Sequence, residues 1–390
     1  MMISHFSGAF SPIIELTGQV FMPSDIREQP PGQTVTFEFF SRSIGLLRFP
    51  LIVLIVFIHA RFQGPDYPDA ATEHLCKSLF WGKMPHCAVA AFFLFSGYLL
   101  ASRTMRRRND QGGIFVSYPD MLRRKFKSLV IPYFIWNTLV MLPHLLIWAL
   151  HLSSSLLPST KFAGMNFFQI LVRTYGLDPR EYPIDVPLWY IRSLMLLFLI
   201  SPVLLFLIRH LPKYLSLCLI IAGTFLLSGE KAVLFFSFGI FCGYFDVDLR
   251  PIKKHWFLYL VPMPAFCLLV SCLPSIRSDV GANLVMTMLN WLFFLFLAAF
   301  AELLGRLPEK SREWLVLAGG YSFWIFCSHA PVATTLSRIG LRFHCLGMPP
   351  LLWILLSCAV TITITLGGFY VVRRVAPRAT AVLCGGRLPK

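Results

Sequence analysis

The sequence is dominated by long apolar stretches that follow one another from residue 45 to residue 372. A helix needs about 20 mostly apolar residues to cross the ~30 Å hydrocarbon layer of a bilayer. Backbone groups inside lipid must also be satisfied within the protein, which favours helices. We therefore predict an all-α, polytopic membrane bundle of about ten transmembrane helices. The predicted spans are residues 45–60, 86–103, 128–150, 187–208, 213–229, 231–246, 256–273, 281–303, 314–336 and 349–372.

Charged residues make up 14% of the chain and hydrophobic residues 56%, whereas a soluble domain has about 25% charged residues. The chain is therefore too apolar to cover a water-facing surface. Its net charge of +16 comes from Lys and Arg concentrated in the connections between apolar runs, where they orient the helices and meet lipid headgroups. We expect membrane lipids as partners and no nucleic acid. With both termini in the cytoplasm, most of the 35 Lys and Arg fall on the cytoplasmic side, so we predict this orientation.

The two ends of the chain differ in character from its middle. Residues 1–40 hold a proline-containing stretch and scattered acids, so we treat them as an extension of unknown role without a signal-peptide pattern. Residues 41–375 form the predicted membrane domain, and residues 376–390 a basic cytoplasmic tail. The long connection 151–186 is predicted to lie outside as a partial lid.

Ionisable side chains inside a span are costly, so each is a candidate for function. Arg48 and His59 are about three helical turns apart on the first span, on one face and about 16 Å apart along its axis. Arg48 would lie at the cytoplasmic mouth and His59 toward the outer half. The alternative is that Arg48 extends to lipid headgroups and His59 hydrogen-bonds a neighbouring helix.

A basic run precedes the third predicted span. Arg123, Arg124 and Lys127 come just before Pro132, and proline bends a helix and frees a backbone carbonyl. Arg124 and Lys127 are spaced to share a helical face. These cations either bind an anionic ligand at the cytoplasmic side or simply anchor the span.

Two more spans carry a basic group at about the depth of His59. Arg192 lies near the outer end of the fourth span, and His329 reaches the outer half of the ninth. We therefore predict an outer layer of His59, Arg192 and His329, and an inner layer of Arg48 with the third-span cations. No carboxylate lies well inside a predicted span, which excludes proton relays and glycosidase chemistry built on Asp or Glu. The remaining histidines lack the spacing of ligands, so we predict no metal.

In order along the chain, five short motifs resemble those of the acyltransferase-3 family of integral membrane O-acyltransferases. They are Arg48 with His59, residues 92–99 (FFLFSGYL) with Ser96 and Tyr98, residues 131–133 (IPY) after the basic run, residues 187–192 (PLWYIR) with Trp189 and Arg192, and residues 321–326 (YSFWIF) with His329.

The resemblance implies transfer of an acyl group, commonly acetyl, from acyl-CoA to a hydroxyl of a cell-envelope glycan or lipid-linked sugar. It also implies a bacterial inner membrane, with acyl-CoA as a co-substrate and no permanently bound cofactor. His59 would then be the general base, because neutral imidazole accepts protons near pH 7. Arg192 or the region of Ser96 would stabilise the oxyanion.

The other candidates divide between the donor and the acceptor. Cations at the cytoplasmic mouth would bind the phosphates of CoA through charge-assisted hydrogen bonds; these are Arg48, Arg123, Arg124 and Lys127. The acceptor pocket would be lined by Ser96, Tyr98, Trp189 and His329. We expect spans one, three, four and nine to enclose a passage that begins at Arg48 and ends beside His59.

Two other functions fit an apolar bundle with buried cations. A transporter or flippase for a lipid-linked anionic glycan would show internal repeats and broken helices at matching positions, and the sequence shows neither. In a membrane interaction protein without activity, the cations would be structural.

Overall fold

The computed structural model describes residues 33–60, 83–110, 118–150, 162, 164–178, 180–227, 231–247, 252, 254–272, 279–343 and 347–388. The regular elements within these ranges are all helical, as predicted. Most of the N-terminal extension lies outside the described residues. The helices that build the site are α1 (Gln33–His59), α3 (Lys83–Asp110), α5 (Ile131–Ala149), α7 (Trp189–His210), α9 (Lys231–Tyr244), α14 (Glu309–Gly320), α15 (Ser322–Arg342), α16 (Pro350–Val375) and α17 (Pro377–Leu383). The others are α4 (Tyr118–Lys125), the π-helix η2 (Phe126–Val130), α6 (Phe167–Tyr175), the 3-10 helix η4 (Val186–Leu188), α8 (Lys213–Leu226), α11 (Trp256–Tyr259), α12 (Pro262–Cys272) and α13 (Asp279–Gly305).

Six segments among the described residues are long and apolar enough to cross a bilayer. They are Phe40–His59, Pro85–Ser102, Tyr118–Ala149, Val186–His210, Val280–Gly305 and Leu351–Val375. These segments overlap predicted spans one to four, eight and ten. The pair α14 and α15 gives a seventh candidate when it is counted as one bent span. The predicted total of ten and the cytoplasmic position of the termini are not confirmed.

Predicted spans five to seven are shorter helices in the structure. They are Lys213–Leu226, Lys231–Tyr244 and Trp256–Val270. The first two contain 14 residues each and rise about 21 Å, which is less than the ~30 Å hydrocarbon layer. Hydropathy measured their apolar character correctly but did not show where each helix ends.

The ninth predicted span is broken. Helices α14 and α15 meet at Tyr321 with a bend of 62°. Gly319 and Gly320 precede the bend, and glycine weakens a helix. A Cβ on Gly319 would lie 3.2 Å from the carbonyl oxygen of Gly45 and from the Cβ of Arg48. Glycine at this position therefore lets α14 pack closely against α1.

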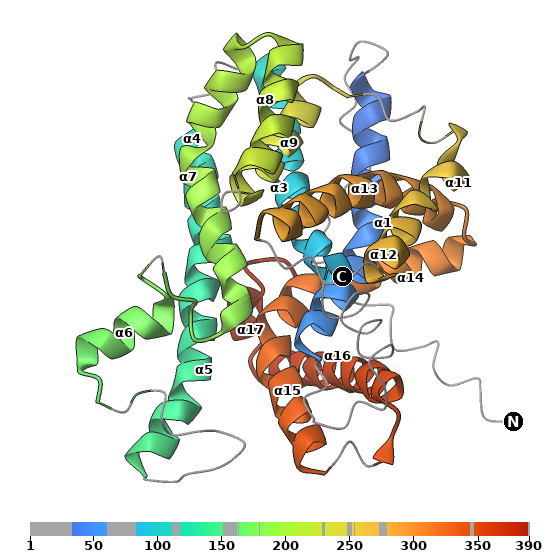
Figure 1. The fold of residues 1–390 in the computed structure, drawn as a ribbon. Coiled ribbons are helices and arrows are strands. Elements are labelled where there is room, and N and C mark those ends of the chain that lie inside the picture. The colour runs from blue at the N-terminus through green and yellow to red at the C-terminus, as the bar shows by residue number, and fades with distance from the viewer. Residues whose placement is uncertain are drawn as a thin grey trace, which may run out of the picture.

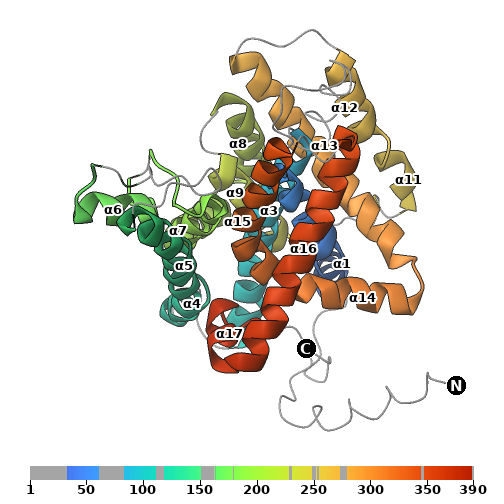
Figure 2. The same cartoon turned by 90° about the horizontal axis from the view of Figure 1, so that it is seen from below.

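The helices are arranged around a central group. Figure 1 shows α1 and α3 in the middle, with α4, α5 and α7 on one side and α11, α12, α13 and α14 on the other. Figure 2 shows the same division and places α15 and α16 across the central helices.

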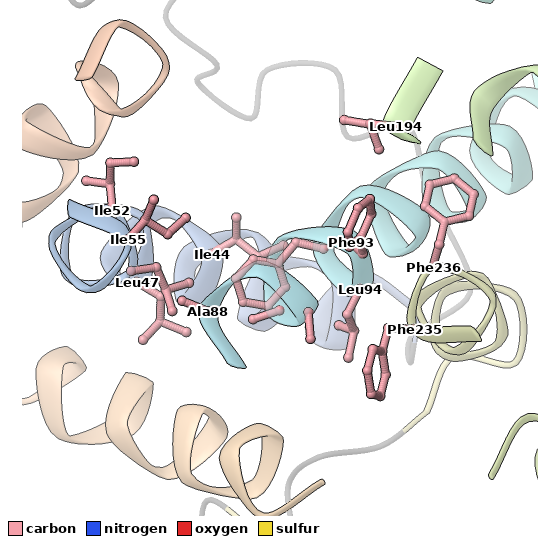
Figure 3. Close-up of a cluster of buried hydrophobic side chains, with 14 of the residues drawn as sticks. Ile44, Leu47, Ile52, Ile55, Ala88, Phe93, Leu94, Leu194, Phe235 and Phe236 are labelled. Atoms are coloured by element: carbon pink, nitrogen blue, oxygen red, sulfur yellow. The ribbon is translucent and has the colours of Figure 1, made fainter. Parts of the chain in front are cut away.

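The core lies where α1, α3 and α9 meet, as Figure 3 shows. Leu47 and Ile52 of α1, Phe93 of α3 and Phe236 of α9 are almost completely buried there. Lipid chains are as apolar as these side chains, so close packing rather than exclusion from water holds spanning helices together.

Glycines bring α3 and α9 into backbone contact. A Cβ on Gly97 would collide with the carbonyl oxygen of Phe236, and one on Gly239 would collide with that of Leu94. Gly243 follows Gly239 after one turn and lies against the carbonyl oxygen of Tyr98. Small residues at this spacing allow two helices to approach closely in a membrane.

Candidate active site

Two imidazoles from distant parts of the chain meet in the bundle. His59 is the last residue of α1, and its ring centre lies 5.1 Å from that of His329 on α15, edge to face. The Ser337 hydroxyl donates a hydrogen bond to the His59 carbonyl oxygen at 3.5 Å. His59 is half-buried. The structure thus brings together two residues of the predicted outer layer.

His329 is fully buried, and its hydrogen bonds fix which ring nitrogen carries the proton. Nδ1 lies 3.0 Å from the carbonyl oxygen of Ile325 and 2.8 Å from that of Phe326. Carbonyl oxygens only accept hydrogen bonds, so Nδ1 is protonated and Nε2 of the neutral ring carries a lone pair. Nε2 has no hydrogen-bond partner in the described structure. In the neutral ring, Nε2 is therefore a buried hydrogen-bond acceptor.

A row of aromatic side chains leads away from the imidazoles. The Phe326 ring centre lies 6.1 Å from that of His329 and 5.5 Å from that of Tyr190. The Tyr190 hydroxyl is 3.5 Å from Oγ of Ser96 on α3. Ser96, Tyr190 and Phe326 are only half-buried, so part of each side chain is not covered by the described protein.

The other two predicted pocket residues, Trp189 and Tyr98, lie in different surroundings. The ring centre of Trp189, the residue before Tyr190, is 6.3 Å from that of Phe93, and the Trp189 side chain is half-buried. Tyr98 is buried and stacks on Phe40 of α1 at 4.1 Å. Because Tyr98 is two residues after Ser96, it points to a different face of α3. Tyr98 thus belongs to the α1–α3 packing.

Arg192 holds the outer connection. Its Nη1 donates to the carbonyl oxygens of Gly176, Glu181 at 2.9 Å and Asp178 at 3.4 Å. Gly176 ends α6 in the left-handed conformation, which turns its carbonyl toward the guanidinium. These contacts make Arg192 a positioning residue for the connection before η4. No contact of Arg192 in the described structure supports its predicted role in stabilising the oxyanion.

The inner cations lie on three separate elements. Arg48 is exposed on α1, Arg123 and Arg124 are exposed on α4, and Lys127 is exposed in η2. The π-helix begins at Phe126, between Arg124 and Lys127, and its wider turn alters the angle between these two side chains from that of a regular α-helix. A π-helical turn holds about one residue more than an α-helical turn, and the sequence alone did not indicate it.

The face of α1 between Arg48 and His59 is packed. Ile52 and Ile55 lie between them on this face and are 1% and 3% exposed. Within the described structure, the predicted passage therefore does not follow this face of α1. A separate hollow is lined by Val172, Leu177, Asp178 and Arg180, beside the outer connection.

Among the described residues, the structure holds no group of three or more His, Cys, Asp or Glu placed to bind a metal ion. The fold and the site together define a multi-pass helical membrane protein with two imidazoles in contact. A family model described as an acyltransferase domain matches residues 41–370, and the chain belongs to this family, acyltransferase-3.

The comparison with curated proteins gives a relative that resembles the chain over most of its length. The succinoglycan biosynthesis protein ExoH of Rhizobium meliloti (strain 1021) is 27% identical over 374 residues, which cover 89% of this chain and 92% of ExoH. No solved structure matches the chain at a significant level.

Sequence reasoning missed one part of this region. Residues 376–388, predicted as a tail, form α17 and a turn that pack against α5 and α16. Trp136 Nε1 donates to the Leu383 carbonyl oxygen at 3.1 Å. The pair Gly385-Gly386 was the available signal, because consecutive glycines often end a helix.

Proposed function

We propose that this protein is a membrane O-acyltransferase that transfers an acyl group, expected to be acetyl, from acyl-CoA to a hydroxyl of a cell-envelope glycan or lipid-linked sugar. Membership of the acyltransferase family supports the reaction class. The name of ExoH, a succinoglycan biosynthesis protein from a bacterium, supports a glycan acceptor and a bacterial inner membrane. The observation that carries the proposal is the contact of His59 with His329, whose Nε2 is buried with an unused lone pair.

The two imidazoles suit different parts of one step. His59 takes the proton of the acceptor hydroxyl while the hydroxyl oxygen attacks the carbonyl carbon of the thioester. His329 accepts a hydrogen bond at Nε2 from a neighbouring hydroxyl of the acceptor and orients it. The new ester bond forms, the carbon–sulfur bond breaks, and the CoA thiolate takes the proton from the His59 imidazolium. No metal enters this step.

The oxyanion formed in this step needs a hydrogen-bond donor. Arg192 already donates to carbonyl oxygens of the outer connection. The hydroxyls of Ser96 and Tyr190, 3.5 Å apart and half-buried, lie on the row that leads to His329. We therefore assign stabilisation of the oxyanion to this hydroxyl pair.

The test is label transfer by the purified full chain in lipid nanodiscs. Acetyl-CoA labelled in its acetyl group is supplied with lipid-linked saccharides from a bacterial envelope. We expect ester-linked label on the saccharide, and a loss of about 10²–10⁴-fold in His59→Ala, with CoA binding retained. His210→Ala is the control, because it removes an exposed imidazole that contacts Phe206 of its own helix and does not lie at the proposed site. Full turnover by His59→Ala overturns the assignment of the base.

The bend between α14 and α15 favours one second candidate, a flippase for a lipid-linked anionic glycan. Broken helices line the substrate sites of many transporters, and Arg48 lies beside this bend, its carbonyl oxygen accepting a hydrogen bond from Ser322 at 3.4 Å. With the same protein reconstituted in sealed vesicles, movement of the lipid-linked saccharide across the bilayer without acetyl transfer would identify the flippase.

A further inference from the structure

The C-terminal segment, residues 376–388, is built into the bundle. Figure 2 shows α17 beside the C-terminal end of α16. Thr380 is fully buried, and Cys384 is 1% exposed. The hydrogen bond from Trp136 to Leu383 ties the end of α17 to α5. The segment lies beyond residue 370, where the family match ends.

Two glycines set the path of the chain after α17. Gly385 and Gly386 have φ of +60° and +74°, a conformation that suits glycine. Their N–H groups donate to Val382 at 2.9 Å and Ala381 at 2.8 Å, as at many helix ends. A Cβ on Gly385 would collide with the carbonyl oxygen of Ser128 in η2. The turn therefore depends on glycine and presses directly on the π-helix.

This turn places the guanidinium of Arg387 beside Phe323 of α15. The guanidinium carbon of Arg387 lies 4.7 Å from the centre of the Phe323 ring, on the first turn of α15. Ser322, next to Phe323, donates to the carbonyl oxygen of Arg48. Arg387 and Arg48 therefore come to the same turn of α15 from different parts of the chain.

The row offers a route that α1 does not. Ile52 and Ile55 fill the face of α1 between Arg48 and His59. In contrast, Phe323 and Phe326 are half-buried and lie one turn apart on α15. Arg387 contacts the first of these rings, and Phe326 contacts Tyr190 and His329. A long thin thioester arm with a polyanionic end suits such a route, because the arm contacts the rings while the phosphates pair with arginine.

We propose that Arg387 is a donor-binding residue, which pairs with a phosphate of acyl-CoA, and that the folded C-terminal segment is a wall of the donor site. This inference rests on the proposed function, since it assumes a CoA donor. It adds a cation that lies outside the five family-like motifs.

The test measures equilibrium binding of radiolabelled CoA to the purified full chain in nanodiscs. We expect Arg387→Gln to weaken binding by about tenfold or more, and Arg387→Lys to restore part of it. Arg378→Gln is the matched control, because Arg378 is exposed on the same segment and should bind CoA as the wild type does. Gly385→Ala, which retains Arg387 but displaces the turn, should also weaken binding.

The outcomes separate the two proposals. If the wild type binds CoA and Arg387→Gln binds it equally well, the C-terminal inference is wrong while the proposed function stands. If the wild type transfers no acetyl group and binds no CoA, the donor assignment fails for both. Equal weakening in Arg387→Gln and Arg378→Gln would show only an unspecific effect of charge and would overturn the site.

Discussion

His59 at the end of α1 and His329 within α15 present their rings to each other edge to face, with ring centres 5.1 Å apart. The two residues differ in what surrounds them. His329 is completely buried and bonded through Nδ1 to its own helix, whereas His59 is half-buried. The ring of His329 is therefore held by its own helix, whereas part of the His59 side chain is not covered by the protein.

Replacing His329 should impair transfer without impairing donor binding. His329→Phe keeps an aromatic ring but removes the Nε2 acceptor, so we expect the KM for the saccharide to rise and turnover to fall by about 10²-fold. The affinity for CoA should not change. His210→Phe is the control, since His210 makes the equivalent bond to its helix on an exposed surface. Normal saccharide kinetics in His329→Phe would contradict the assignment.

Removal of the guanidinium of Arg192 should loosen the outer connection. Arg192→Gln loses hydrogen bonds to Gly176 and Glu181, and such bonds contribute about 1–3 kcal/mol when the donor is charged. Hydrogen exchange should accelerate in residues 176–188 and not in α9. If turnover falls while exchange in this connection stays slow, Arg192 acts on the reacting atoms instead.

The backbone contact between α3 and α9 should tolerate no side chain. Gly239→Val places carbon atoms where the Leu94 carbonyl oxygen lies, and overpacking of this kind costs about 1–3 kcal/mol or more. We expect a lower midpoint of thermal unfolding in detergent. Gly367→Val on α16 is the control, because a Cβ there meets nothing within 4 Å. If Gly239→Val and Gly367→Val unfold at the same temperature, the contact between α3 and α9 does not require glycine.

The docking of α17 can be followed by the reactivity of Cys384. Burial raises the pKa of its thiol to about 11, so at pH 7.5 the reactive thiolate is scarce and shielded. N-Ethylmaleimide should modify the exposed Cys218 first and Cys384 slowly. Gly385→Ala should accelerate modification of Cys384, because the turn no longer fits against Ser128. An unchanged rate would show that the turn does not need glycine.

The sequence predicted the helical class and several spans well, because apolar length directly reports burial in lipid. It was less informative where helices end or bend. Spans five to seven were apolar enough but too short, and the bend at Tyr321 depends on how Gly319 packs against Gly45, which is a tertiary contact.

For the site, helical spacing placed His59 and His329 at a common depth, and the structure shows them in contact. Spacing could not show which partners a side chain finds. Arg192 donates hydrogen bonds to backbone carbonyl oxygens, and Tyr98 stacks on Phe40. Arg387, which contacts Phe323, belongs to a segment that the sequence described only as a basic tail. Each of these outcomes depends on contacts between residues far apart in the sequence.

The glycine contact between α3 and α9 has a mechanical consequence. Because the two backbones touch at Gly97 and Gly239, α3 and α9 have no room for a side chain between them. Ser96 precedes Gly97, so this contact also holds the Ser96 hydroxyl in place, 3.5 Å from the hydroxyl of Tyr190. The geometry of the hydroxyl pair therefore depends on two glycines that carry no functional group of their own.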